Sequence, residues 1–149
     1  MIFKKTLLFS TFVVGLLRRH LILAKDMSGE CAASNSSYIS GTHSVAYVTI
    51  DTEDKAKKLA HGIVSNKLAA CVNIIPKILS VYEWEGTINE ESEFLMMIKT
   101  RTSKVDALTQ YVKANHPYTV CEVISIPITN GNDAYLKWIG ETVPKSQCE

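Results

Sequence analysis

Three side chains in this sequence are the strongest candidates to bind a transition metal. His116 offers an imidazole nitrogen, Cys71 a thiolate and Glu122 a carboxylate oxygen. Imidazole suits copper, zinc and nickel, and thiolate is a soft ligand for Cu(I) and zinc. Structural roles compete with these: a cysteine can fill space in a strand, and a histidine can contact carbonyls at a helix end. As metal ligands, we rank His116 and Cys71 first, with Glu122 as an oxygen donor.

The cysteine spacing argues against a structural zinc site. The four cysteines lie 40, 50 and 27 residues apart and form no Cys-x-x-Cys pair, the pattern such sites usually contain. Cys121 directly precedes Glu122, so in a regular strand the two side chains point to opposite sheet faces. At most one of them therefore faces a given cleft. Cys31 and Cys148 lie in the expected tails.

Catalytic motifs are missing from the sequence. It contains no GxxxxGK[ST] or GxGxxG phosphate loop and no metalloprotease helix. A nucleophile and base formed by Cys71 and His116 would require the two side chains to lie within hydrogen-bond reach. We rank that arrangement last and predict that the protein is not an enzyme.

Strand and helix patterns alternate along the chain. Apolar residues recur at helical spacing from Ala56 to Leu68, after Asp51 and Thr52 as capping residues. Pro76 marks a bend in a long strand because it lacks a ladder donor. The expected strands cover 44–50, 69–75 with 78–84, 93–100 and 120–128. The expected helices cover 56–68, the segment from Thr102 or Ser103 to His116, and 133–139.

This order of elements, βαββαβ followed by a helix, predicts an α+β fold. Right-handed crossovers turn it into an antiparallel four-stranded sheet with both main helices on one face, a ferredoxin-like plait. The other face of the sheet stays open and carries large apolar residues. Such a face needs a partner, most simply copies of the same chain.

Aromatic residues recur at positions that could meet between subunits. They are Tyr82, Trp84, Tyr118 and Trp138, with charge from Glu93, Lys99 and Glu122. Interface packing and ligand recognition both account for such a set, and packing is the commoner cause. In a cleft between subunits, Lys99 could pair with Glu93 or Glu122 as a structural ion pair.

The charge of the chain is divided unevenly. Its net charge is +1, but residues 1–25 hold five of the 16 basic side chains and none of the 15 acidic ones. The remainder therefore has an acidic excess and no basic surplus to neutralise phosphates. We exclude nucleic-acid binding as the function of the main body.

The N-terminal segment 1–26 is predicted to be a targeting leader or membrane-associated segment. Its apolar run of 12 residues would span about 18 Å as a helix, which is short for a membrane. Secretory, mitochondrial and cytosolic fates all remain open, the last through a start at Met27. We expect a flexible linker over 27–43, with a glycosylation sequon at Asn35, one domain over 44–143 and a tail over 144–149.

Five strings in order resemble the CutA family of divalent-cation-tolerance proteins, especially its animal members. They are Ala69-Ala70-Cys71-Val72-Asn73, Ser80-Val81-Tyr82-Glu83-Trp84-Glu85-Gly86, Met97-Ile98-Lys99-Thr100, His116-Pro117-Tyr118 with Glu122, and Tyr135-Leu136-Lys137-Trp138. The resemblance covers residues 44–143, the whole expected domain.

The resemblance implies a homotrimer of ferredoxin-like subunits, similar to PII-type proteins, without catalytic activity. It also implies binding of copper or another divalent metal and, in animals, a role in anchoring or processing acetylcholinesterase. Bacterial copper-binding members have a first-strand cysteine and a His-His-Pro-Tyr sequence, whereas this chain has Thr49 and Asn115 at those places. We therefore expect weak metal binding with none held tightly. The alternative function is a PII-like sensor with a small molecule between subunits.

Overall fold

The computed structural model describes residues 38–145. The predicted leader, most of the linker with Asn35, the tail beyond residue 145, and the cysteines at 31 and 148 lie outside the described residues. Within this part of the chain, no helix is long and apolar enough to cross a membrane.

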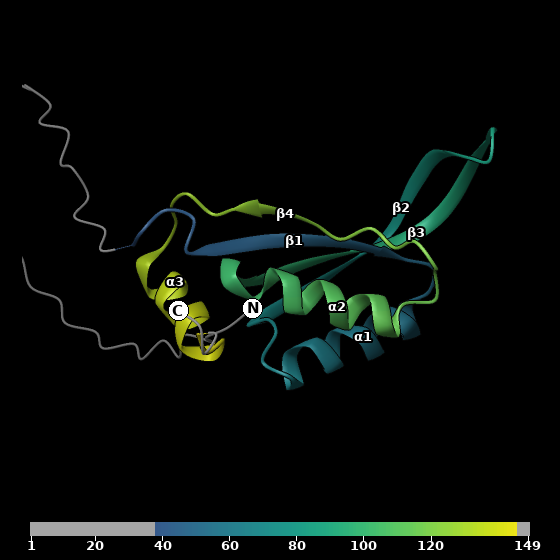
Figure 1. Ribbon diagram of the computed structural model, residues 1–149. Helices are drawn as coiled ribbons and strands as arrows, with labels where there is room; N and C mark the ends of the chain where they lie inside the picture. Colours follow the sequence, from purple (N-terminus) through teal and green to yellow (C-terminus); the bar gives the residue numbers. More distant parts are fainter. Residues whose placement is uncertain (1–37, 146–149) are drawn as a thin grey trace, which may run out of the picture. The chain divides into compact units, whose positions relative to one another are not determined.

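The described residues form four strands, three α-helices and one short 3-10 helix (Figure 1). In chain order they are β1 (His43–Ile50), α1 (Glu53–Ser65), β2 (Cys71–Trp84), β3 (Thr87–Arg101), the 3-10 helix η1 (Thr102–Lys104), α2 (Val105–Asn115), β4 (Ile124–Pro127) and α3 (Asp133–Thr142). This order confirms the predicted α+β fold.

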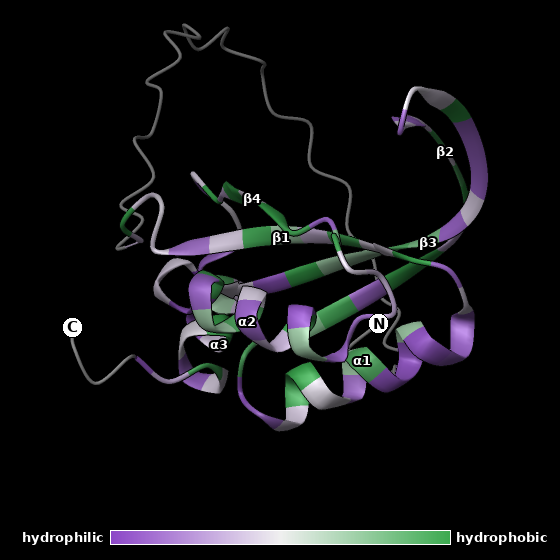
Figure 2. Cartoon of the chain, turned by 45° about the vertical axis from the view of Figure 1, so that its right-hand side comes forward, coloured by the Kyte–Doolittle hydropathy of each residue, from purple (hydrophilic) through white to green (hydrophobic). Residues whose placement is uncertain are grey.

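The sheet has the strand order β2-β3-β1-β4, and every neighbouring pair is antiparallel. Helices α1 and α2 cover one face, as Figure 1 shows. Ile63 of α1 and Leu108 of α2 are fully buried with Val48 and Ile98 of the strands in one core. Figure 2 shows hydrophobic residues along the strands, and hydrophobic alternating with hydrophilic residues along α1, the pattern of a helix with one buried face.

The β2–β3 hairpin projects beyond the helices (Figure 1). Its turn residues, Glu85 and Gly86, both have positive φ, at 50° and 79°, as a two-residue type I′ turn requires. The bend predicted at Pro76 is confirmed by a register shift between Ile75 and Ile78. The hairpin thereby carries the side chains of its tip well away from the main core.

Strand β4 is shorter than the predicted 120–128, and His116 explains why. Residues 43, 45, 47 and 49 of β1 direct their backbone groups toward β4, because the side of a strand to which these groups point alternates. The Thr49 carbonyl, which would continue this ladder, instead lies 2.8 Å from Nε2 of the His116 ring. The side chain replaces the strand partner, and pairing with β1 begins only at Ile124.

Two helix ends also differ from the predictions. Helix α1 ends at Ser65 rather than at residue 68, because Lys67 has a φ of 57° and the Leu68 amide returns to the Ile63 carbonyl. The side chain of Thr102, an expected cap of the second helix, donates to the Gly41 carbonyl instead. Residues 102–104 form η1, and α2 follows without a side-chain cap.

The domain begins before the predicted boundary at residue 44. The Tyr38 hydroxyl donates to the Ile128 carbonyl at 3.0 Å and accepts from the His43 amide. The Tyr38 and His43 rings lie 5.5 Å apart. The linker predicted over 27–43 therefore extends too far at its C-terminal end. Its polar composition gave no sign that Tyr38 packs against the domain.

His43 joins the start of β1 to α3 and is only 3% exposed. Its Nε2 lies 2.9 Å from the Leu136 carbonyl, whereas Nδ1 is buried without a hydrogen-bond partner among the described residues. Burial lowers the pKa of His43 below 6.5; the Leu136 carbonyl opposes this shift and the nearby Arg101 adds to it. The folded state therefore favours the neutral ring.

We expect folding stability to fall as pH drops below about 6.5, because the unfolded chain then binds a proton that the folded chain resists. Urea unfolding at pH 7.5 and pH 5.5 measures the change. His43→Gln should reduce this difference relative to the unsubstituted chain, whereas His61→Gln, at an exposed site on α1, should leave it intact. An unchanged difference in His43→Gln would contradict the prediction.

Candidate functional site

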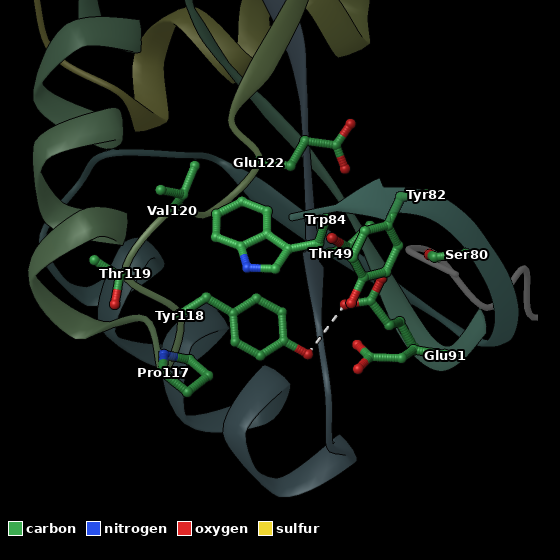
Figure 3. Close-up of a pocket in the computed structure, with 11 residues that line it drawn as sticks. Thr49, Ser80, Tyr82, Trp84, Glu91, Pro117, Tyr118, Thr119, Val120 and Glu122 are labelled. Atoms are coloured by element: carbon green, nitrogen blue, oxygen red, sulfur yellow. Dashed lines mark hydrogen bonds between the residues drawn. The ribbon is translucent and has the colours of Figure 1, made fainter. Parts of the chain in front are cut away.

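A pocket of about 660 Å³ lies between the β2–β3 hairpin and the segment that follows α2 (Figure 3). We call it the hairpin pocket. Its lining residues are Thr49, Ser80, Tyr82, Trp84, Glu91, Glu93, Pro117, Tyr118, Thr119, Val120 and Glu122. Three strands and one loop thus contribute to a single concave surface.

Strand geometry places the hairpin side of this pocket. Ser80 is paired with Glu91 across the β2–β3 ladder, and alternate residues of a strand share one face. Tyr82 and Trp84 on β2 therefore lie on the same side as Ser80, and Glu93 on β3 lies on the same side as Glu91. All five line the pocket.

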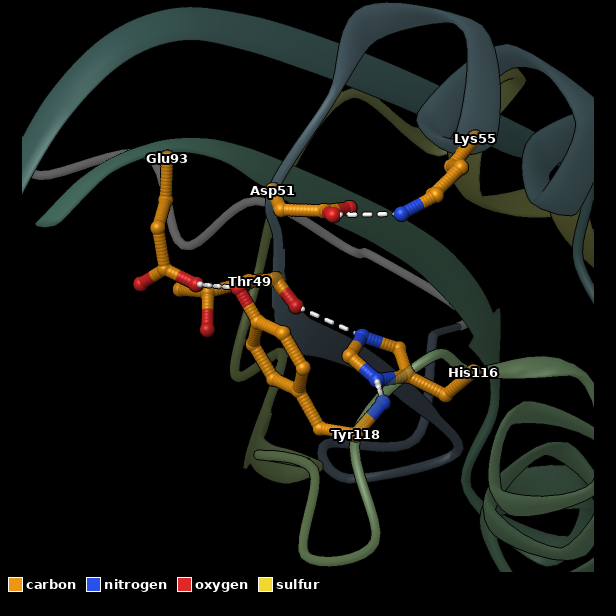
Figure 4. A network of polar contacts seen from close by, with 6 residues as sticks. All are labelled: Thr49, Asp51, Lys55, Glu93, His116 and Tyr118. Carbon is orange, nitrogen blue, oxygen red and sulfur yellow. Dashed lines mark hydrogen bonds and ion pairs between the residues drawn. The ribbon is translucent and has the colours of Figure 1, made fainter.

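His116 holds the opposite wall in place (Figure 4). The Tyr118 amide donates to Nδ1 of His116 at 3.1 Å, so Nε2 carries the ring proton and donates it to the Thr49 carbonyl. The His116 and Tyr118 rings meet edge to face, 5.0 Å apart. Both nitrogens of this imidazole are therefore engaged, and a metal ion would have to displace one of these contacts.

Tyr118 connects that wall to β3. Its hydroxyl donates to Oε1 of Glu93 at 3.2 Å, and the Glu93 residue is only 5% exposed. Burial, followed by the nearby charge of Glu93, raises the pKa of Tyr118 far above its usual range. Burial and a hydrogen bond with Glu91 raise the pKa of Tyr82 in the same direction. Both phenols therefore stay neutral at physiological pH.

The pocket concentrates negative charge. Glu91, Glu93 and Glu122 line it, and no lysine or arginine is among its lining residues. Within residues 38–145 the ion pairs join partners four positions apart along the chain and involve none of these glutamates: Lys55–Asp51, Lys57–Glu53 and Lys137–Glu141. The hairpin pocket is therefore a place where a cation is attracted.

The three predicted metal ligands do not meet within the chain. Glu122 lines the hairpin pocket, and His116 acts behind it. Cys71 lies opposite Lys99, which is paired with the Val45 end of β1. That point is four residues, or about 13 Å, along β1 from Thr49. Among the described residues, no group of three or more His, Cys, Asp or Glu side chains is placed to hold a metal ion.

The remaining predicted contacts are only partly formed. Lys99 donates to Oδ1 of Asn73 and to the Met97 carbonyl, so within one chain it forms no ion pair with Glu93 or Glu122, and a pair between subunits stays a prediction. Trp138 packs on Tyr135 at 5.3 Å, outside the pocket.

Cys121 and Glu122 do take opposite sides, since Cys121 packs against the core while Glu122 lines the hairpin pocket. Glu91 lines the same pocket and is not among the residues predicted from the sequence. Its spacing of two from Glu93 in a strand was the available signal.

Comparison with known proteins gives a consistent result. Residues 44–142 match the family model described as CutA1 divalent ion tolerance protein. Protein CutA homolog of Xenopus laevis is 58% identical over 112 residues, which are 75% of this chain and 74% of that relative. Protein CutA of Homo sapiens is 53% identical over 106 residues, which are 71% of this chain and 59% of that relative. This chain thus covers less than two thirds of the human protein.

Solved structures agree with the sequence match. The crystal structure of CutA1 from Oryza sativa is similar with a TM-score of 0.68 and 52% identity, covering 70% of this chain and 95% of that one. At this level of identity the similarity extends beyond the fold to the sequence of the domain.

Proposed function

Because the chain belongs to the CutA1 divalent ion tolerance family, we propose that it is a non-enzymatic homotrimer that binds divalent metal ions weakly. The metal is cargo in this proposal, with copper as the expected ion. The observation that carries the proposal is the hairpin pocket, where Glu91, Glu93 and Glu122 lie without a basic side chain in the lining. Carboxylate oxygens attract divalent cations.

The geometry supports weak binding, because the described residues contain no preformed set of three ligands. Of the predicted ligands, Glu122 is the one that faces the pocket. His116 contributes by holding Tyr118 through its Nδ1 contact. Within one chain Cys71 lies beside Tyr135. It would add a soft ligand to a metal site only if another subunit placed a second metal ligand next to it.

The trimer is proposed from apolar surface that a single chain leaves uncovered. On the hairpin, Leu79, Val81 and Ile88 are 65%, 59% and 67% exposed, and on β4 Ile124 and Ile126 are more than half exposed. Exposed apolar residues grouped on the hairpin and on β4 are typical of association surfaces. Copies of the same chain are the simplest partner.

A further part of the proposal concerns the partner outside the trimer. The resemblance to animal members of the family suggests that this partner is acetylcholinesterase or its membrane anchor. The trimer would then act as an interaction scaffold for it. Co-sedimentation of the full chain with acetylcholinesterase tests it, and sedimentation of each protein at its separate rate would contradict it.

Titration calorimetry of the full chain with Cu(II) and Zn(II) tests the metal proposal. Glu122→Gln should weaken Cu(II) affinity about thirtyfold, since one charge about 4 Å from a divalent ion in water contributes roughly 2 kcal/mol. Asp106→Asn makes the same charge change on α2, outside the pocket lining, and should leave affinity unchanged.

Two further variants test whether the other two predicted ligands bind the metal. If His116→Ala and Cys71→Ser both leave the Cu(II) affinity unchanged, neither side chain is a metal ligand. Equal affinities for Glu122→Gln and the unsubstituted chain would contradict the role of the hairpin pocket.

A second candidate function is a PII-like sensor of small molecules. The observation in its favour is the size of the hairpin pocket, about 660 Å³, together with its three aromatic walls. Sites for small ligands usually have volumes of this order and apolar linings with a few polar groups. A thermal-shift screen of the full chain with small metabolites, nucleotides included, tests this role.

A further inference from the structure

The hairpin pocket combines carboxylates with aromatic rings. In Figure 3 the rings of Tyr82, Trp84 and Tyr118 lie between Glu122 on one side of the pocket and Glu91 on the other. Trp84 and Tyr82 remain 54% and 38% exposed, so their rings are available to a ligand. Aromatic faces attract ammonium groups, and their apolar area packs against methylene chains.

Glu93 supplies a second and independent reason to expect a cation. It is 5% exposed and lines the pocket, and its carboxylate accepts a hydrogen bond from the neutral hydroxyl of Tyr118. No ion pair within residues 38–145 includes Glu93. A buried carboxylate without an opposite charge is costly, and a ligand ammonium group would offset that cost.

The same features disfavour anionic ligands. Phosphates and nucleotides would meet three carboxylates and no basic side chain. A weakly bound metal ion, as proposed above, would use only the carboxylates and would leave the three aromatic walls without a role. A ligand that fits all the features carries positive charge at two places, joined by an apolar chain.

We propose that the hairpin pocket binds a linear alkyl diamine or polyamine. One ammonium group pairs with Glu93 and Glu91, the alkyl chain lies along Trp84 and Tyr118, and the second ammonium group pairs with Glu122. This assignment rests on the small-molecule role proposed above and names its ligand class. It does not depend on metal binding.

The two tryptophans of the chain allow a direct assay. In a full chain carrying Trp138→Phe, Trp84 is the sole tryptophan and reports on the pocket. Its fluorescence is followed during titration with 1,5-diaminopentane, with EDTA present to remove divalent ions. Pentylamine, with one charge, and 1,5-pentanediol, with none, are the matched control compounds.

We expect saturable quenching or enhancement of Trp84 emission by the diamine, with pentylamine at least about tenfold weaker and the diol without effect. Glu122→Gln, at an exposed position, should weaken diamine binding about tenfold, and Glu93→Gln should weaken it at least as much. Asp106→Asn should leave it unchanged.

The outcomes separate this inference from the function on which it rests. If the diol binds as well as the diamine, the pocket takes small molecules without regard to charge; the ligand class is then wrong and the sensor role stands. If Glu122→Gln binds the diamine as tightly as the parent chain, the proposed pairing is wrong. If none of the three compounds binds and the metabolite screen is also negative, both proposals fail.

Discussion

A chain carrying Val81→Lys and Ile88→Lys is expected to sediment as a monomer, whereas we expect the unsubstituted chain to sediment as a trimer of 16.5 kDa subunits. The two side chains are 59% and 67% exposed on the projecting hairpin. Covering such a side chain in an interface contributes about 1.5–3 kcal/mol, and the loss recurs in every subunit. Two buried ammonium groups per subunit would oppose assembly further.

Analytical ultracentrifugation over a range of concentrations measures this effect. Gln110→Lys with Ala114→Lys is the matched control, because it adds two lysines at exposed positions of α2. Circular dichroism checks that each variant retains its fold. A monomeric unsubstituted chain, or a trimeric hairpin variant, would contradict the proposed interface.

Arg101→Gln is expected to destabilise the domain by about 3 kcal/mol or more. The guanidinium donates from Nε to the Val143 carbonyl and from Nη2 to the Gly140 carbonyl, both at 2.5 Å. These carbonyls belong to the C-terminal turn of α3, where no further helical residue satisfies them. Hydrogen bonds from a charged donor contribute about 1.5–3 kcal/mol each.

Urea unfolding at one fixed protein concentration measures this loss, because the stability of an oligomer depends on concentration. The stability of Arg101→Lys should lie between those of the unsubstituted chain and Arg101→Gln, since a lysine retains the charge but not the planar fork of donors. Lys113→Gln removes a positive charge from an exposed site on α2 and should change stability little. An Arg101→Gln variant as stable as Lys113→Gln would refute this role for the guanidinium.

Arg101 also explains why α3 extends beyond its predicted C-terminal end. The apolar pattern indicated a helix over 133–139, whereas the structure continues it to Thr142. The contacts from Arg101 come from a strand more than thirty residues earlier, so no local pattern contains them. Gly140 permits the approach, since a Cβ there would lie 3.1 Å from the guanidinium.

Local sequence signals were sufficient for most of the fold. The helical repeat beginning at Ala56 and the Pro76 bend each follow from residues next to one another in the chain. Backbone and side-chain preferences of this kind act over a few residues, which is why they can be read without a structure. The crossover rule then left one economical topology for the sheet.

The site depended on contacts between distant segments. The sequence indicated Glu122, Tyr82, Trp84 and Tyr118, but it could not show that Glu91 completes the set or that Trp138 lies elsewhere. Strand register decides which residues face each other across a hairpin. That register was fixed here by the bulge and the two-residue turn together.

By itself the sequence determined the family and the order of the helices and strands. It also indicated that one face of the sheet is apolar and needs a partner. Composition, periodicity and local motifs carry that information. Only the tertiary structure decided what the candidate ligands do. His116 uses both nitrogens to join Thr49 to Tyr118, while Cys71 lies at the other end of the sheet. Side-chain chemistry depends on what each group touches, and those contacts form only when the chain folds.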